Sequence, residues 1–130
     1  MDTKAYCLAD FIICCMSNPE KIHVEYDAVL NAQHQFGLNT KTELLNFIGN
    51  GGLQDMSYVN TEPWRNKPQK ITGEILIDSY NFRSNRKVGY IAFFKGIPGN
   101  YVIKSFHLDH NKITLGSVGN NSIKPLGVKE

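Results

Sequence analysis

The chain has 130 residues, a formal net charge of +2 and 42% hydrophobic residues. This length suits one domain with a modest core, and the composition argues against wholesale disorder. No apolar run approaches the length of a membrane span, so we expect no membrane partner. We predict a single domain over residues 1–130, with a helical part at about 4–49, a sheet part at about 71–118 and a tail at 119–130.

The three cysteines all lie near the start of the chain, at Cys7, Cys14 and Cys15. An odd number with two adjacent residues is a poor disulfide framework and fits no zinc-ligand spacing. They are interpreted as small apolar residues of a helix in a reducing compartment. The apolar opening contains Asp10 and lacks a positively charged n-region, which argues against a signal peptide. The sequence therefore predicts a cytoplasmic protein.

The charges are distributed unevenly along the chain. Residues 1–60 carry three Lys/Arg against seven Asp/Glu, whereas residues 61–130 carry eleven against five. A basic half built on a sheet favours an anionic partner, and nucleic acid is the commonest of these. An unequal scatter of solubilising charges explains the same counts equally well.

The first predicted helix covers residues 4–16. Its apolar side chains recur at helical spacing, at Leu8, Phe11, Ile12 and Cys15. The helix ends before Pro19, because proline disfavours helical backbone in the residue that precedes it. A short extended piece is possible at residues 21–24.

Two further helices follow. The first runs from about Glu25 to Phe36, with Gly37 as its C-terminal cap. The second starts at Thr40, where the threonine and Glu43 fit a capping box, and it closes at residue 49. Residues 54–70 carry no clear pattern, although they contain the only tryptophan of the chain.

The second half of the chain is dominated by three β-branched and aromatic runs, at about residues 74–82, 88–94 and 101–108. A short basic loop separates the first two, and a loop rich in glycine and proline separates the last two. Loops this short make antiparallel neighbours. The sequence therefore predicts an antiparallel meander of three strands, with residues 112–118 as a possible fourth. Helices followed by an antiparallel sheet indicate an α+β fold.

The sequence contains none of the common motifs that identify a binding or catalytic function: it has no phosphate loop, dinucleotide fingerprint, HExxH or paired CxxC. His107 and His110 suggest a metal, but residues three apart on a strand point to opposite faces. We therefore expect neither a metal nor a cofactor.

The most informative set of side chains lies on the predicted meander. Pairing of the last two strands brings Tyr90 opposite His107, and alternation puts Ser105 on the face of His107 but Lys104 on the other. A tyrosine, a histidine and several cations on an open sheet can cleave RNA without metal. One group takes the 2′-hydroxyl proton, another protonates the leaving 5′-oxygen, and cations stabilise the phosphate charge. The alternative to a catalytic site is that the tyrosines are half-buried aromatic residues of the sheet and that the histidine is an exposed strand end.

In order and spacing, the chain resembles the MqsR family of bacterial ribonuclease toxins, which belongs to the wider RelE-like group of α+β endoribonucleases. Residues 26–38, YDAVLNAQHQFGL, are similar to the helix of that family that ends in glycine-leucine. Asp78-Ser79-Tyr80, followed ten residues later by Tyr90, is similar to an Asp-x-Tyr and a Tyr at the same separation. The strand that ends in Ser105-Phe106-His107 is similar to the family's terminal strand, which ends in Ser-Phe-Lys.

The resemblance implies an active-site tyrosine at Tyr90 and places His107 at the family's terminal catalytic lysine. Imidazole can replace that lysine as an acid or base near neutral pH. The family's active-site glutamine and its other lysine fall near Ile77 and Gln54, so these two do not carry over.

Taken together, these features predict a metal-independent endoribonuclease toxin of RelE-like architecture, paired with a cognate antitoxin or immunity protein. Its substrate is RNA, either free messenger or messenger on the ribosome. The catalytic candidates are Tyr90 and His107, and the RNA-binding candidates are Tyr80, Arg83, Arg86, Lys87 and Lys104. Two alternatives stay open: a non-catalytic binding module of the immunity or phage-inhibitor type, and a Trp64-centred reader that stacks bases without cutting them.

Overall fold

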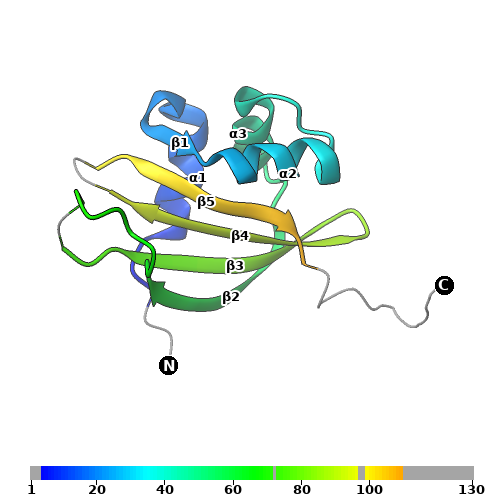
Figure 1. The fold of residues 1–130 in the computed structure, drawn as a ribbon. Helices are drawn as coiled ribbons and strands as arrows, with labels where there is room; N and C mark the ends of the chain where they lie inside the picture. The colour runs from blue at the N-terminus through cyan, green and yellow to red at the C-terminus, as the bar shows by residue number, and fades with distance from the viewer. Residues whose placement is uncertain (1–3, 72, 97–98, 110–130) are drawn as a thin grey trace.

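The computed structural model describes residues 4–71, 73–96 and 99–109 (Figure 1). The helices precede most of the sheet in the chain: α1 (Leu8–Ser17), the 3₁₀ turn η1 (Pro19–Lys21), α2 (Tyr26–Phe36) and α3 (Lys41–Gly49). The strands are β1 (Ile22–Val24), β2 (Gln54–Pro63), β3 (Leu76–Ser84), β4 (Lys87–Lys95) and β5 (Tyr101–Leu108). The α+β class predicted from the sequence is confirmed.

The strands form one mixed sheet in the order β1-β5-β4-β3-β2. Strands β3, β4 and β5 make the predicted antiparallel meander, with a tight turn at Asn85 and Arg86 between β3 and β4. Asn85 has a φ of 57°, a left-handed conformation that asparagine tolerates better than most residues. Short β1 lies parallel to β5, and the long connection that such a pair needs is supplied by the elements from α2 to β4.

The predicted sheet of three or four antiparallel strands is wrong in two respects. The sheet has five strands, and it is mixed because β1 pairs parallel with β5. Residues 54–63 form β2, which pairs antiparallel with β3 at the opposite edge from β1. This strand was missed because its register slips twice, between Gln54 and Ser57 and between Tyr58 and Asn60, so no clean alternation is visible in the sequence. The predicted extended piece at residues 21–24 is present as β1, and residues 112–118 lie outside the described residues.

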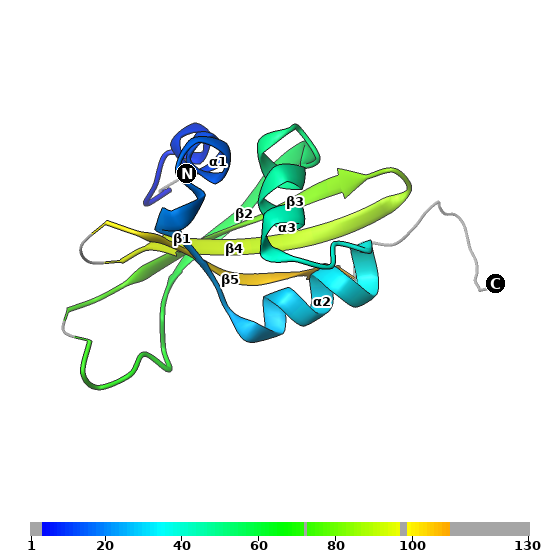
Figure 2. The ribbon, with the colours of Figure 1, turned by 90° about the horizontal axis from the view of Figure 1, so that it is seen from above.

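Figure 2 shows α1 and α3 on one side of the sheet and α2 running alongside β5, and buried side chains of all three helices join one core. The rings of Phe11 and Phe93 stack with centroids 4.0 Å apart, which joins α1 to the centre of β4. Phe36 of α2 lies 4.9 Å from Phe106 of β5, and Phe47 of α3 meets the same ring edge-on at 6.3 Å. Aromatic pairs of this kind add to the stabilisation that comes from buried area. The core therefore fills the space between the helices and one sheet face.

The helix ends follow local sequence chemistry. Gly37 closes α2 in the left-handed conformation, with a φ of 69°. The Thr40 side chain accepts a hydrogen bond from the backbone N–H of Glu43, as the predicted capping box requires. The Glu43 carboxylate, however, accepts from the N–H of Asn39 rather than from that of Thr40. In α1 the helix starts at Leu8, four residues later than predicted.

A buried carboxylate joins the start of the chain to the sheet. Asp78 of β3 is fully buried on the helix side and accepts hydrogen bonds from the backbone N–H groups of Ala5 and Tyr6 at 2.9–3.0 Å. The Thr61 hydroxyl of β2 also donates a hydrogen bond to it. A buried carboxylate is tolerated where donors replace the lost water. Asp78 thus fixes the segment before α1 against β3 and β2.

Candidate functional site

The sheet face opposite the helices carries most of the predicted site residues; we call it the open face. Alternation along β3 and β4 directs Ser79, Asn81, Tyr90 and Ala92 to this face, while Tyr80, Phe82, Ile91 and Phe93 point to the core. The register aligns Asn81, Tyr90 and His107 in one row across three strands. The next row contains Asn60, Ser79, Ala92 and Ser105.

Tyr90 and His107 are directly opposite each other on β4 and β5, as predicted. Their rings stack with centroids 5.1 Å apart and planes 24° apart. Both side chains are only partly buried, so substrate can reach them. Stacking limits the rotation of each ring and holds the phenol and imidazole side by side.

The backbone selects the tautomer of His107. Its Nδ1 lies 2.7 Å from the carbonyl oxygen of Leu108, and a carbonyl can only accept a hydrogen bond. The proton of the neutral ring is therefore on Nδ1, and Nε2 has the free lone pair that a general base needs.

Lys104 lies on the open face, contrary to the strict alternation predicted for β5. The pairing shifts so that Ala92 faces Ser105 and Phe93 faces Ile103, which leaves Lys104 unpaired as an extra residue. Such a bulge lets two consecutive side chains lie on the same side of a strand. Lys104 and Ser105 accordingly line the same pocket as Tyr90.

That pocket, which we call the polar pocket, has a volume of about 140 Å³. Its walls combine one cation, hydroxyl and amide groups and one acid, contributed by Asn60, Glu62, Pro63, Ile77, Ser79, Tyr90, Ala92, Lys104 and Ser105. The Ser79 hydroxyl donates to Oδ1 of Asn60 at 2.8 Å, and Nδ2 of Asn60 donates to Glu62 at 3.1 Å. A pocket of this size and polarity suits a phosphate group or a ribose.

The remaining cationic candidates lie around the β3–β4 hairpin and do not form one cluster. Arg83 is on the open face, two residues from Asn81, and its Nε lies 3.7 Å from a carboxylate oxygen of Asp55. Arg86 occupies the exposed turn. Lys87 turns toward the helices, where Nζ donates to the carbonyl of Gln35 at 2.7 Å. Only Arg83 among these three shares the face of Tyr90.

Tyr80 is not on the open face. It is 3% exposed, its ring stacks with Phe93 at 6.3 Å and meets Tyr58 edge-on at 5.6 Å. β3 directs Tyr80 to the covered side of the sheet, so Tyr80 does not share the surface that carries Tyr90 and His107.

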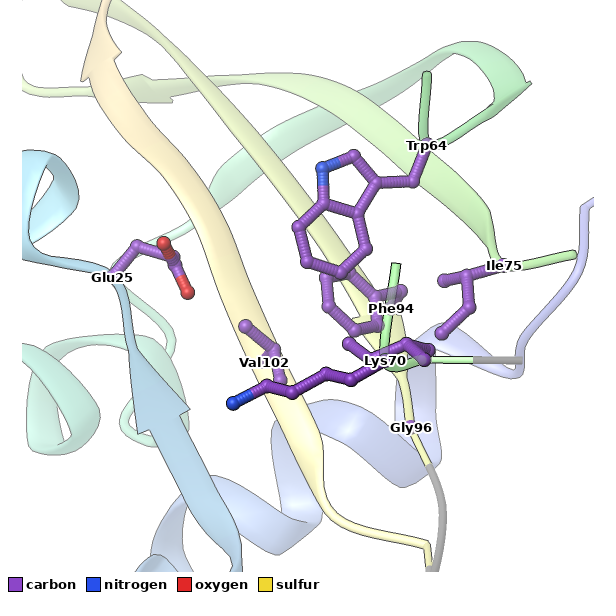
Figure 3. A pocket seen from close by; sticks show the side chains of 8 residues that line it. Glu25, Trp64, Lys70, Ile75, Phe94, Gly96 and Val102 are labelled. Carbon is purple, nitrogen blue, oxygen red and sulfur yellow. The ribbon is translucent and has the colours of Figure 1, made fainter. Parts of the chain in front are cut away.

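A second cavity, which we call the aromatic pocket, lies beside Phe94 and Val102 near the end of β4 and the start of β5 (Figure 3). It has a volume of about 440 Å³ and is lined by Glu25, Trp64, Lys70, Ile71, Ile75, Phe94, Gly96 and Val102. The rings of Trp64 and Phe94 are 5.0 Å apart, and Lys104 Nζ lies 5.8 Å from the centre of the Trp64 ring. Lys104 therefore stands between the two pockets.

Sequence reasoning missed several polar residues of the open face, including Asn60, Ser79 and Asn81. Nδ2 of Asn81 donates to Asp109 at 2.7 Å and to the Gly89 carbonyl at 3.1 Å, which fixes the row that contains Tyr90. Alternation within β3 already separated Ser79 and Asn81 from Tyr80. The sequence does not show which face of the sheet the helices cover, so alternation alone does not assign Ser79 and Asn81 to the open face.

Within the described ranges, no three His, Cys, Asp or Glu side chains are grouped so that they could hold a metal ion. His110, the partner considered for His107 in the sequence, lies outside those ranges. No helix in the described part of the chain is both long and apolar enough to cross a membrane.

We compared the chain with protein-family models, with curated proteins and with solved structures, and found no significant match in any of the three. Function must therefore be inferred from the residues of the open face themselves.

Proposed function

We propose that this protein is a metal-independent endoribonuclease that cleaves RNA on the open face of its sheet. The observation that carries the proposal is the stacked pair of Tyr90 and His107 beside the polar pocket. An acid–base pair next to a cation and a phosphate-sized pocket is what RNA transesterification needs.

In the proposed reaction, Nε2 of His107 removes the proton from a ribose 2′-hydroxyl. The 2′-oxygen attacks the adjacent phosphorus, and the bond from phosphorus to the 5′-oxygen breaks. The Tyr90 hydroxyl supplies a proton to that leaving oxygen. The products are a 2′,3′-cyclic phosphate and a free 5′-hydroxyl. Lys104 stabilises the charge that gathers on the phosphate oxygens, and Arg83 binds the strand farther along the same face.

We further propose that the chain acts as the toxin of a toxin–antitoxin or toxin–immunity pair, with the RelE-like architecture that its resemblance to the MqsR family implies. The antitoxin would neutralise it by covering the open face. A toxin stops growth when it is produced alone, so induction of the single chain tests this part directly. Growth should resume in the double variant Tyr90→Phe with His107→Ala.

The decisive experiment is incubation of the purified protein with a long structured RNA in EDTA. We expect fragments that end in 2′,3′-cyclic phosphate, and we expect none from His107→Ala. His34→Ala is a matched control, because His34 is an exposed histidine on α2. RNA left intact both alone and with ribosomes present would refute the nuclease proposal.

The second candidate is a non-catalytic binding module that uses the same face. The specific observation in its favour is the aromatic pocket, since Trp64 beside Lys104 resembles the platforms on which single-stranded nucleic acids stack. In that case the RNA remains intact, and the affinity falls steeply as salt is raised.

A further inference from the structure

The aromatic pocket takes no part in the proposed chemistry, although it opens on the same face as Tyr90. Its walls are mainly aromatic and aliphatic, with one cation and one carboxylate at separate points (Figure 3). We propose that this pocket binds one nucleobase that carries an exocyclic amino group, and so sets the sequence preference of the nuclease. This inference rests on the proposed function.

The first argument is the stacking surface. Phe94 is 4% exposed and forms part of the pocket floor, and its ring lies 5.0 Å from that of Trp64. The backbone N–H of Trp64 also donates to the Ile75 carbonyl at 2.8 Å, so the indole is held at both its ring and its backbone. An indole fixed in this way offers a base a platform with little ordering cost.

The second argument is the placement of the cations. The Lys70 side chain extends along the pocket, and its Nζ lies on the side of Val102 and Glu25 (Figure 3). Lys104 lies against Trp64 and also lines the polar pocket. One ammonium group is thus available inside the aromatic pocket, and a second lies on the path to Tyr90. This arrangement complements the phosphates on either side of a bound nucleoside.

The third argument is the carboxylate. Glu25 lines the pocket on the far side of Val102 from Trp64 (Figure 3), and its backbone N–H donates to the Ile103 carbonyl at 3.0 Å. An ionised carboxylate only accepts hydrogen bonds, so it favours a base that presents an amino group. Cytosine, adenine and guanine have such a group, whereas uracil has none.

The two pockets are close enough together for a single strand of RNA to occupy both. Phe94 and Tyr90 are four residues apart on the same face of β4, which corresponds to about 13 Å along the strand. A short single strand can therefore place a base against Trp64 while a nearby phosphodiester lies beside Tyr90 and His107.

Trp64 is the only tryptophan of the chain, so its fluorescence reports on this pocket alone. We would titrate the full chain with each of the four ribonucleoside monophosphates and correct for absorption with free N-acetyltryptophanamide. We expect CMP, AMP and GMP to quench the fluorescence saturably. These three should bind with about tenfold higher affinity than UMP, because one hydrogen bond to a charged group has an effect of this size. Equal affinity for all four, or no saturable quenching, would overturn the inference.

Two variants test which side chain causes the base preference and which one binds the phosphate. Glu25→Gln should remove most of the preference over UMP, because an amide both donates and accepts. Lys70→Ala should lower the affinity for all four nucleotides by a similar factor, since it removes a contact with the phosphate. Lys41→Ala is the control, because Lys41 is an exposed lysine at the start of α3. An unchanged preference in Glu25→Gln would show that this carboxylate does not read the base.

The test separates this inference from the nuclease proposal. Selective nucleotide binding by the wild-type protein, together with RNA that the wild-type protein leaves intact both alone and with ribosomes present, supports the base pocket and refutes the nuclease. Cleavage whose sequence preference is the same in the wild type and in Glu25→Gln, without quenching by any nucleotide, supports the nuclease and refutes the base pocket.

Discussion

Tyr90 and His107 face each other across β4 and β5, with ring centroids 5.1 Å apart and planes inclined by 24°. Neither residue is near the other in sequence, and the register of the hairpin alone brings them together. Because the Leu108 carbonyl accepts a hydrogen bond from Nδ1–H, the proton stays on Nδ1, and the pair consists of a hydroxyl that can give a proton and a ring nitrogen, Nε2, that can accept one.

The two rings should be functionally coupled. We expect Tyr90→Phe and His107→Ala each to lower the cleavage rate by about 10²–10⁴-fold, the usual contribution of an acid or base. The double variant should lose less than the product of these factors, because removing either ring also loosens the other. Single-turnover cleavage rates of the three variants measure the coupling, and strictly multiplicative losses would show that the rings act independently.

Lys104 should act on the transition state, whereas Arg83 should act on binding. We expect Lys104→Ala to lower the maximal rate by roughly 10²-fold, as for loss of one oxyanion donor. Arg83→Ala should mainly raise KM and reduce the salt dependence of RNA binding by about 0.7 in the log–log slope. Cleavage kinetics at several salt concentrations distinguish the two, with Lys41→Ala as the control. Identical effects of both variants would contradict these roles.

Asp78 should be important for stability rather than for chemistry. Asp78→Asn leaves the N–H groups of Ala5 and Tyr6 facing an amide that has only one acceptor oxygen. We expect a loss of about 2 kcal/mol in the free energy of unfolding, the cost of poorly satisfied buried donors. Urea denaturation measures it. Asp27→Asn, at an exposed position in the first turn of α2, should cost about 0.5 kcal/mol or less.

The cysteines should differ in reactivity. Burial, with a smaller contribution from Cys14, raises the pKa of the Cys15 thiol to about 12. Cys15 is also 1% exposed, whereas Cys7 is exposed. In native protein a disulfide reagent should therefore label Cys7 rapidly and Cys15 only after unfolding. Fast labelling of Cys15 in the native state would show that α1 opens locally.

The same thiol should make the fold sensitive to alkali. Because the folded pKa of Cys15 lies above its ordinary value of 9.0, the folded chain keeps this proton while the unfolded chain loses it. Its contribution to stability is complete below pH 9.0 and is lost as the pH rises toward 12, by at most about 1.4 kcal/mol per pH unit. Burial also raises the pKa of Tyr6 and Tyr101, which adds to the loss at higher pH. Cys15→Ala should flatten the first part of a plot of unfolding free energy against pH.

The sequence by itself determined the elements whose signals are local. Apolar spacing gave α1, the glycine at position 37 gave the end of α2, and short turn-rich loops gave the β3–β4–β5 meander. These features depend on residues within a few positions of one another. Tyr90 and His107 are distant in sequence, but the short loop between β4 and β5 sets the register of that hairpin, and the predicted pairing of the two residues followed from it.

Tertiary structure decided which face of the sheet is open. Alternation separates Tyr80 from Ser79 and Asn81, but only the packing of the helices shows that Tyr80 is on the covered side. The bulge that turns Lys104 toward the polar pocket depends on the pairing of β5 with β4, not on the sequence around Lys104. Likewise, Trp64 belongs to a pocket because β2 pairs with β3 and brings it over Phe94. Contacts between distant segments have no local signature, because the free energy that selects them comes from burying surfaces that meet only in the folded chain.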